Sequence, residues 1–372
     1  MHPEKFVLFC AGEDSGDILG ESLVRECLRQ GYKVRGVGGP RMQRAGLESS
    51  VDYEMLPVSG FGDVLPRVIR LKRILSHLEN LLRSEECVAL VCIDYPGFNM
   101  KLVPMAESLK KPVLYVAPPQ VWAWKRGRIK RLRQARLAVL FDFERKFFEK
   151  SGCNAVLLRH PFPVVQGENA NGTLLLLPGS RKSQAMRNLP FFVEVASRYH
   201  RENPAGKVAV LASRTSLEKD FAGFLQKNYG GTVPEWVSIE SVPLESGARA
   251  EFFSRCSQAI CTPGSATLEL ALSGVPMVVA DVLDPLTYFM GKHFVKTDYF
   301  ALPNILLQKG AIPEFFFTKG AARREESVLR VAQSLATRDV ADARNIAAAL
   351  SATFAAAESP ESLMLEFLGQ LV

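Results

Sequence analysis

Four short segments place glycine, hydroxyl and charged residues directly after an apolar run, where ligands bind in α/β proteins. The first is residues 11–17, AGEDSGD, which contains Gly12, Glu13, Ser15 and Gly16. The backbone N–H groups of such a turn can hold an anion or a sugar hydroxyl. The segment lacks the Gly-x-Gly-x-x-Gly spacing and the lysine of a P-loop, so it does not favour a dinucleotide or ATP site. An ordinary N-capped turn before a helix explains it equally well.

The second segment, residues 93–99 (IDYPGFN), brings Asp94 directly behind an apolar run. A carboxylate at the end of a strand can act as a general base that deprotonates an incoming hydroxyl. The alternative is an aspartate that caps the next helix or closes the Pro-Gly turn, and taken alone this segment favours that alternative.

Two further segments predict phosphate contacts, residues 177–181 (LPGSR) and 262–269 (TPGSATLE). In the first, helix N-terminal N–H groups and the Arg181 guanidinium form a phosphate site. In the second, small residues let the backbone approach a diphosphate, and Glu269 lies one turn into the helix, where it can bind ribose hydroxyls. Two such turns in one half of the chain favour a nucleoside diphosphate. No Asp-x-Asp pair accompanies them, so we expect Arg181, helix dipoles and Lys296 to stabilise the leaving group without a metal ion.

The composition is that of a soluble globular protein with an anionic partner. Of 372 residues, 47% are hydrophobic and 23% are charged, and the net charge is +7. The seven cysteines form no Cys-x-x-Cys pair and the five histidines lack zinc-site spacing, so we expect reduced core thiols, no structural metal and no cofactor. No apolar run is long enough for a membrane span, and the apolar start is too short for a signal peptide, which predicts a cytoplasmic protein.

Two basic segments are candidates to contact that partner. Residues 65–82 place leucines on one helical stripe beside basic side chains, which fits a helix on an anionic membrane surface or an amphipathic helix facing the core. Residues 125–136 are basic at seven of twelve positions and follow Trp122 and Trp124. No nucleic-acid recognition module accompanies this cluster, so we expect a lipid headgroup or a phosphorylated substrate there, and no nucleic acid. The stripe and its basic neighbours are Leu71, Leu75, Leu78, Leu82, Arg67, Arg70, Lys72 and Arg73.

Parallel α/β layers must position these segments, because short apolar runs alternate with helical stretches such as 17–29. The polar, turn-rich stretch 163–172 is the expected linker. We predict doubly wound domains at 1–165 and 173–340, followed by helices at 341–372 that are candidates to pack back on the first domain. The expected strands are 6–10, 33–37, 88–93, 113–116, 137–141, 155–158, 173–177, 207–211, 237–239, 258–261 and 276–280, and an Ala-rich helix is expected at 340–357.

Taken in order, eight blocks of sequence resemble the lipid-A-disaccharide synthase family, whose members are GT-B type glycosyltransferases of bacteria with an outer membrane. The resemblance covers almost the whole chain. It implies two Rossmann-like parallel-sheet domains that face a cleft, an acceptor and lipid domain first and a UDP-sugar domain second. The blocks are AGEDSGDILG (11–20), GVGGPRM (36–42), IDYPGFN (93–99), PPQVWAWKRGRI (118–129), RHPF (159–162), LLPGSR (176–181), GSATLE (264–269) and VKTDYFALPN (295–304).

The resemblance also implies the reaction. An inverting, metal-free transfer moves 2,3-diacylglucosamine from its UDP derivative to 2,3-diacylglucosamine 1-phosphate, giving UDP and the β-1,6-linked lipid A disaccharide 1-phosphate. Asp94 matches the family's proposed base, and Arg181 matches the arginine expected near the UDP phosphates. The other residues that the resemblance places in substrate binding are Gly12, Glu13, Ser15, Gly16, Asn99, Trp122, Trp124, His160, Gly179, Ser180, Gly264, Ser265, Ala266, Thr267, Glu269, Lys296 and Asn304.

Partners and place in the cell follow from the same resemblance. Diacylated substrates imply peripheral contact with anionic lipids on the cytoplasmic face of the inner membrane, and the leucine stripe of residues 65–82 is the expected surface. A homodimer is kept as a candidate assembly.

Five positions depart from the family pattern and leave alternatives open. The nearer alternative is another UDP-sugar enzyme of the same fold, such as a UDP-N-acetylglucosamine epimerase or a lipid-linked cell-wall glycosyltransferase. The other is a membrane-associated UDP-sugar binder without catalysis. The departures are Gly97 in place of an acidic residue, Gln184 in place of Glu, Arg159 in place of Gly, Asp142 in place of Pro and Phe316 in place of Gln.

Overall fold

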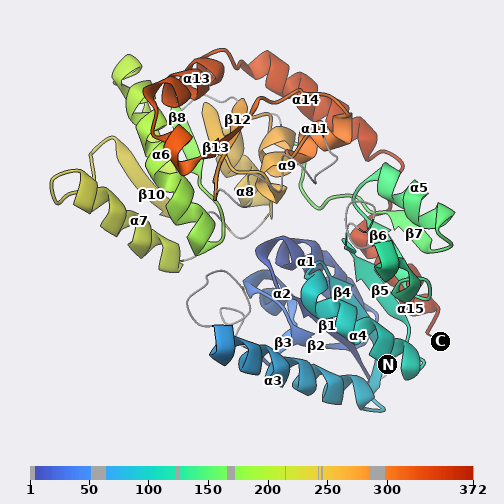
Figure 1. The fold of residues 1–372 in the computed structure, drawn as a ribbon. Helices are drawn as coiled ribbons and strands as arrows, with labels where there is room; N and C mark the ends of the chain where they lie inside the picture. Colours follow the sequence, from blue (N-terminus) through green and yellow to red (C-terminus); the bar gives the residue numbers. More distant parts are fainter. Residues whose placement is uncertain are drawn as a thin grey trace. The chain divides into compact units, whose positions relative to one another are not determined.

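The structure is a computed structural model that describes residues 5–51, 64–119, 121, 126–165, 172–213, 215–241, 243, 246–284 and 298–371. Contacts within the chain divide it into two compact units (Figure 1). The first comprises Met1–Pro161 and Ala356–Val372, and the second comprises Phe162–Ala355. The chain therefore returns to the first unit at residue 356.

The first unit is built on a seven-stranded sheet in the order β3-β2-β1-β4-β5-β6-β7, in which every neighbouring pair is parallel. Helices connect the strands, as parallel pairing requires. The strands are β1 (Phe6–Ala11), β2 (Lys33–Val37), β3 (Glu48–Ser49), β4 (Cys87–Ile93), β5 (Val113–Val116), β6 (Arg136–Val139) and β7 (Asn154–Leu157). The helices are α1 (Asp14–Arg29), α2 (Pro40–Ala45), α3 (Val64–Arg83), α4 (Pro96–Ser108), α5 (Asp142–Lys150) and α15 (Pro360–Gly369), with the 3-10 helix η2 (Arg126–Arg131).

Two apolar clusters cover the two faces of this sheet. Strand β1 is buried throughout, and its side chains alternate between the clusters: Leu8 and Cys10 belong to one, Val7 and Phe9 to the other. Parallel strands that are buried on both faces appear in the sequence as continuous apolar runs. These strands could therefore be predicted from the sequence.

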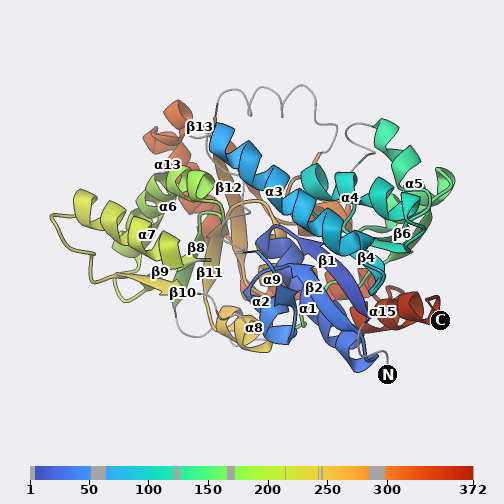
Figure 2. The ribbon, with the colours of Figure 1, turned by 90° about the horizontal axis from the view of Figure 1, so that it is seen from below.

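Helix α3 packs its leucines against the first unit's own core and lies beside α4 (Figure 2). Leu78 and Leu82 are fully buried, and Leu71 and Leu75 are half-buried against the same cluster. The expectation that this stripe forms the membrane-contacting surface is therefore wrong, because these side chains are core residues. Its basic neighbours face solvent at Arg70, Lys72 and Arg73.

The second unit contains a six-stranded parallel sheet in the order β10-β9-β8-β11-β12-β13. Its own apolar cluster packs helices such as α6 and α13 against the strands. The strands are β8 (Thr173–Leu177), β9 (Lys207–Ala212), β10 (Val237–Ser241), β11 (Gln258–Cys261), β12 (Met277–Leu283) and β13 (Glu314–Thr318). The helices are α6 (Lys182–Glu202), α7 (Thr215–Asn228), α8 (Ser246–Ser254), α9 (Ser265–Leu272), α11 (Leu302–Leu307), α12 (Lys319–Ala322), α13 (Glu325–Ala336) and α14 (Val340–Thr353).

Each of the eleven expected strands is present, with its ends shifted by a few residues at most. Strands β3 and β13 were not predicted: β3 has two residues, and β13 lies at the sheet edge and is mostly half-buried, so neither gives a strand pattern. All seven cysteines are buried free thiols, as expected. Among the described residues, no helix combines the length and the apolar character needed to cross a bilayer.

Candidate active site

Asp94 directly follows β4, at the carboxyl edge of the first unit's sheet. Asp94 has a φ of 48°, and Tyr95 has a φ of 48° and a ψ of 53°, so two consecutive non-glycine residues adopt the left-handed region. Each such residue costs about 1–3 kcal/mol and persists only where the surrounding structure fixes it. Strained backbone of this kind concentrates at functional sites, which makes this position a candidate for chemistry.

Three hydrogen bonds hold this strained backbone. The Asp94 N–H donates to the Val116 carbonyl at 2.9 Å, and the Asp94 carbonyl accepts from Asn99 Nδ2 at 2.8 Å and from the Tyr115 hydroxyl at 3.1 Å. Asn99 is fully buried, and its Nδ2 also lies 3.1 Å from the Cys10 carbonyl. The Asn99 amide therefore joins the ends of β1 and β4, which favours a positioning role for Asn99 over direct contact with a substrate.

Tyr115 was not predicted from the sequence. It lies in the wholly buried run VLYV of β5, where nothing distinguishes it from an ordinary core tyrosine. Burial raises the pKa of the Tyr115 phenol well above its usual value, so the hydroxyl stays protonated and remains a donor.

The Asp94 carboxylate meets the turn that follows β1. Ser15 Oγ donates to Asp94 Oδ2 at 3.1 Å. A Cβ on Gly12 would overlap the Tyr95 ring, and one on Gly16 would touch the backbone carbonyl at the end of β4 at 3.4 Å. The first two segments singled out in the sequence therefore lie against each other, and only glycine fits at position 12.

Asp17, another carboxylate in the segment after β1, supports the fold. It is buried, and its two oxygens accept from the N–H groups of Arg41 and Met42, each at 3.0 Å. It thereby binds the N-terminus of α2, where a carboxylate is stabilised by the helix dipole. Glu13 is the half-buried N-cap residue of α1.

His160 is buried, and it lies at the end of Met1–Pro161, the first of the two stretches of chain that form this unit. Burial lowers the pKa of the imidazole to about 3, so His160 is neutral at physiological pH. Trp122, Trp124 and Lys296 lie outside the described residues. Across the part of the chain that the structure describes, no group of three His, Cys, Asp or Glu side chains could hold a metal ion.

The two glycine turns of the second unit emerge side by side. Strands β8 and β11 are neighbours, and their last residues, Leu177 and Cys261, pair in register. The Thr262 N–H donates to the Leu177 carbonyl at 3.1 Å. The turns that follow these strands therefore share one edge of the sheet, which is where open α/β sheets bind ligands.

The turn after β8 leads into the N-terminus of α6. Gly179 has a φ of +127°, and a Cβ there would lie 2.7 Å from Gln184 Oε1, so this position favours glycine. Ser180 and Arg181 are exposed, and Arg181 is the N-cap residue of α6. Unpaired N–H groups at a helix N-terminus beside a guanidinium suit a phosphate.

A network of polar side chains, centred on the buried Asn188, holds the turn after β8. Asn188 Nδ2 donates to the Pro178 carbonyl at 3.1 Å and to Asp281 Oδ1 at 2.9 Å, while Asn188 Oδ1 accepts from the Val282 N–H at 2.6 Å. Gln184 Nε2 lies 3.4 Å from Asp281 Oδ2. Burial is the main cause that raises the pKa of Asp281. The network links the end of β8 to β12, and it gives Gln184, a departure from the family pattern, a partner that an ionised Glu would repel.

Gln184→Glu should lower the free energy of unfolding by about 1–3 kcal/mol at neutral pH, because a donor is replaced by a second carboxylate facing Asp281. Two carboxylates that face each other raise each other's pKa in the folded protein. A carboxyl group with a raised folded-state pKa contributes its full stability below its unfolded-state pKa, and this contribution is lost as the pH rises through the folded-state pKa. The deficit should therefore shrink at acidic pH. Urea unfolding of both proteins at about pH 5 and about pH 8 measures it.

Gln226→Glu on the exposed side of α7 is the matched control for this prediction, since it makes the same chemical change away from Asp281. A Gln184→Glu deficit that equals the control, or that does not change with pH, would contradict the assigned contact.

The turn after β11 is shaped by buried side chains. Gly264 is exposed with a φ of +150° and precedes α9. Thr267 Oγ1 donates to the Gly264 carbonyl at 2.7 Å and accepts from the Leu302 N–H at 3.2 Å. Glu269 is buried and forms an ion pair with Arg249. Thr267 therefore holds the turn, and Glu269 links α9 to α8. The more exposed residues of the turn are Gly264, Ser265 and Ala266.

The Asn304 side chain also forms its hydrogen bonds within the second unit. It is fully buried, exchanges hydrogen bonds of 2.7 and 2.9 Å with the Ile312 backbone, and donates to Glu314 Oε1 at 2.7 Å. Glu314 also accepts from the N–H groups of Phe300 and Ala301 at the start of α11. This arrangement favours a positioning role for Asn304, and Glu314 was not predicted.

The comparisons with known proteins agree with this architecture. The family model described as Lipid-A-disaccharide synthetase matches residues 7–364. The chain belongs to the lipid-A-disaccharide synthase family. A lipid-A-disaccharide synthase of Geobacter metallireducens is 31% identical over 340 residues, which cover 87% of this chain and 86% of the relative. One from Anaeromyxobacter dehalogenans is 32% identical, with 91% and 90% covered.

Solved structures show the fold of this lipid-A-disaccharide synthase family member. The Spinosyn Rhamnosyltransferase SpnG is 11% identical with a TM-score of 0.58, and covers 98% of this chain and 100% of its own. Arabidopsis thaliana UGT89C1 is 8% identical with a TM-score of 0.59, and 99% of each chain is covered. The GT-B fold with two parallel sheets is thereby confirmed, and family and fold together make the chain a glycosyltransferase.

Proposed function

We propose that this chain transfers 2,3-diacylglucosamine from its UDP derivative to 2,3-diacylglucosamine 1-phosphate, producing lipid A disaccharide 1-phosphate and UDP. Membership of the family over residues 7–364 supports the reaction. The observation that carries the mechanism is the carboxylate of Asp94, held at the carboxyl end of β4 on a strained backbone and oriented by Ser15.

Asp94 is the general base of this proposal. As the acceptor 6-hydroxyl attacks C1 of the donor sugar, the carboxylate takes the hydroxyl proton, the new O6–C1 bond forms, and the bond from C1 to the UDP oxygen breaks. Attack from the face opposite UDP inverts C1 and gives the β linkage. Asn99 and Tyr115 act by fixing the Asp94 backbone, so they are positioning residues.

The second unit supplies the stabilisation of UDP in this proposal. The N–H groups at the start of α6 and α9, together with Arg181, would receive the negative charge that develops on the leaving diphosphate. Fixed dipoles that need no reorganisation are effective at this task. Peripheral contact with anionic lipids on the cytoplasmic face of the inner membrane, and a homodimer, remain parts of the proposal.

Incubation with both lipid substrates, followed by mass spectrometry of the product, tests the function. We expect the disaccharide 1-phosphate and stoichiometric UDP, with UDP released only when donor and acceptor are both present, and activity retained in EDTA. Interconversion of UDP-N-acetylglucosamine without an acceptor would instead indicate an epimerase. Binding of UDP with no product would indicate a binding protein and would overturn the proposal.

A further inference from the structure

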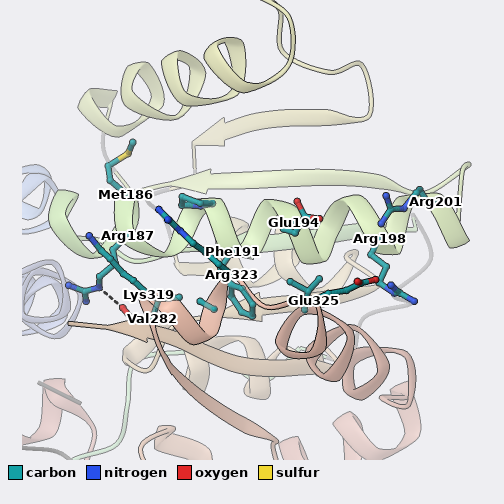
Figure 3. A pocket seen from close by; sticks show the side chains of 13 residues that line it. Met186, Arg187, Phe191, Glu194, Arg198, Arg201, Val282, Lys319, Arg323 and Glu325 are labelled. Carbon is teal, nitrogen blue, oxygen red and sulfur yellow. Dashed lines mark hydrogen bonds between the residues drawn. The ribbon is translucent and has the colours of Figure 1, made fainter. Parts of the chain in front are cut away.

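A groove in the second unit is lined by basic and apolar side chains that have no role in the proposed transfer. It lies between α6 on one side and α12 and α13 on the other, and its volume is about 730 Å³ (Figure 3). Its most buried lining side chains are apolar, so the floor can accept hydrocarbon. These are Phe191, Val282, Ala322 and Val328, and Met186 and Pro190 extend the apolar lining.

The rim of the groove is strongly cationic. Figure 3 shows the cations spread along its length, from Arg187 and Lys319 at one end to Arg198 and Arg201 at the other. With Arg323 there are five cations, against the two carboxylates of Glu194 and Glu325. Among the lining side chains, cations therefore outnumber carboxylates by three, and they come from α6 and from α12 and the residue after it, which are far apart in sequence.

Three of these cations are available to a ligand. Arg187 is engaged with the Val282 carbonyl and lies 4.0 Å from Asp281, and Arg198 pairs with Glu202 at 3.5 Å. For the other three, no ion pair with a described carboxylate is found. They are Arg201, Lys319 and Arg323.

We infer that this groove binds the phosphate of an anionic phospholipid, with the cations on the phosphate and the first methylenes of the acyl chains along the apolar floor. A free phosphate would leave most of the volume and all of the apolar lining unused, whereas an anionic amphiphile matches both. The inference rests on the proposed function in one respect: diacylated substrates place the chain where such lipids are concentrated. It moves the expected lipid contact from α3, whose leucines pack against the core of the first unit, to the second unit.

Sedimentation of the full chain with vesicles tests the inference. Wild type should bind phosphatidylcholine vesicles that contain phosphatidylglycerol, and should not bind phosphatidylcholine alone. Lys319→Gln/Arg323→Gln should weaken binding about thirtyfold, because each basic residue near an anionic surface adds a separate attraction. The matched control, Lys219→Gln/Lys227→Gln on α7, removes the same amount of charge from two exposed lysines elsewhere in the second unit and should have little effect.

Three results would overturn the inference: no preference of wild type for the anionic vesicles, an equal loss in both double variants, or calorimetric binding of inorganic phosphate in the groove without vesicle binding. Turnover with detergent-solubilised substrates is measured in parallel and should not change in either variant. Vesicle binding is scored without substrate, so a failure of the proposed reaction is distinguished from a failure of the lipid site.

Discussion

Asp94→Asn should lower turnover by about 10²–10⁴-fold while the dissociation constant of UDP stays nearly constant. Asparagine keeps the size of the side chain and can still accept a hydrogen bond from Ser15, but it cannot take a proton from the acceptor hydroxyl. UDP affinity is assigned to the second unit, so it should not follow the loss. Steady-state kinetics with both lipid substrates and calorimetry with UDP measure the two quantities.

Asp142→Asn is the control for this experiment. It makes the same change in the first turn of α5, where the carboxylate pairs with Arg145 and Lys146 on the surface. Near wild-type turnover of Asp94→Asn would refute the general-base role. The search would then move to Glu13, because the Asp17 carboxylate is already bound to the N-terminus of α2.

Arg181→Ala should weaken UDP binding by about 10–150-fold, since a charge-assisted hydrogen bond contributes about 1.5–3 kcal/mol. The side chain is exposed at the N-terminus of α6, so the fold should be unaffected. Calorimetric titration with UDP gives the effect, and thermal unfolding confirms that the variant is folded.

Lys182→Ala removes a cation one residue away, whose ammonium lies 2.7 Å from Asp220. If general charge at the helix start were responsible for affinity, the two variants would behave alike. An unchanged UDP dissociation constant for Arg181→Ala would remove this arginine from the site and leave the turn at Gly264 as the phosphate contact.

The strands of both sheets could be predicted from the sequence, because parallel strands buried on both faces appear as apolar runs. The four glycine-containing segments that follow strands could be predicted as well, because a glycine turn directly after an apolar run is a clear local pattern. The sequence did not predict how α3 is used. A leucine stripe beside basic residues is the same pattern on a membrane and on a core, and only tertiary contacts decide between them.

The roles of Asn99, Asn304 and Tyr115 were beyond the sequence for a related reason. Each is fully buried, and each donates to a backbone carbonyl outside its own strand or helix, such as the Cys10 carbonyl for Asn99 and the Ile312 carbonyl for Asn304. Motif resemblance marks a residue as important without saying whether it touches the substrate or holds a neighbour. Tyr115 belongs to no recognisable motif, because in the apolar run of β5 it looks like an ordinary core tyrosine.

Helix α15 has a consequence for how the protein is made. Its Leu363 and Phe367 are buried in the same cluster as residues of α1 and β1, and the Glu358 N–H donates to the carbonyl of Leu157, the last residue of β7, at 2.9 Å. During synthesis, these residues leave the ribosome about 10–40 s after the first 161, at ordinary translation speeds. The unit that is translated first thus stays incomplete, with apolar surface of α1 open to chaperones, until the unit translated second has fully emerged.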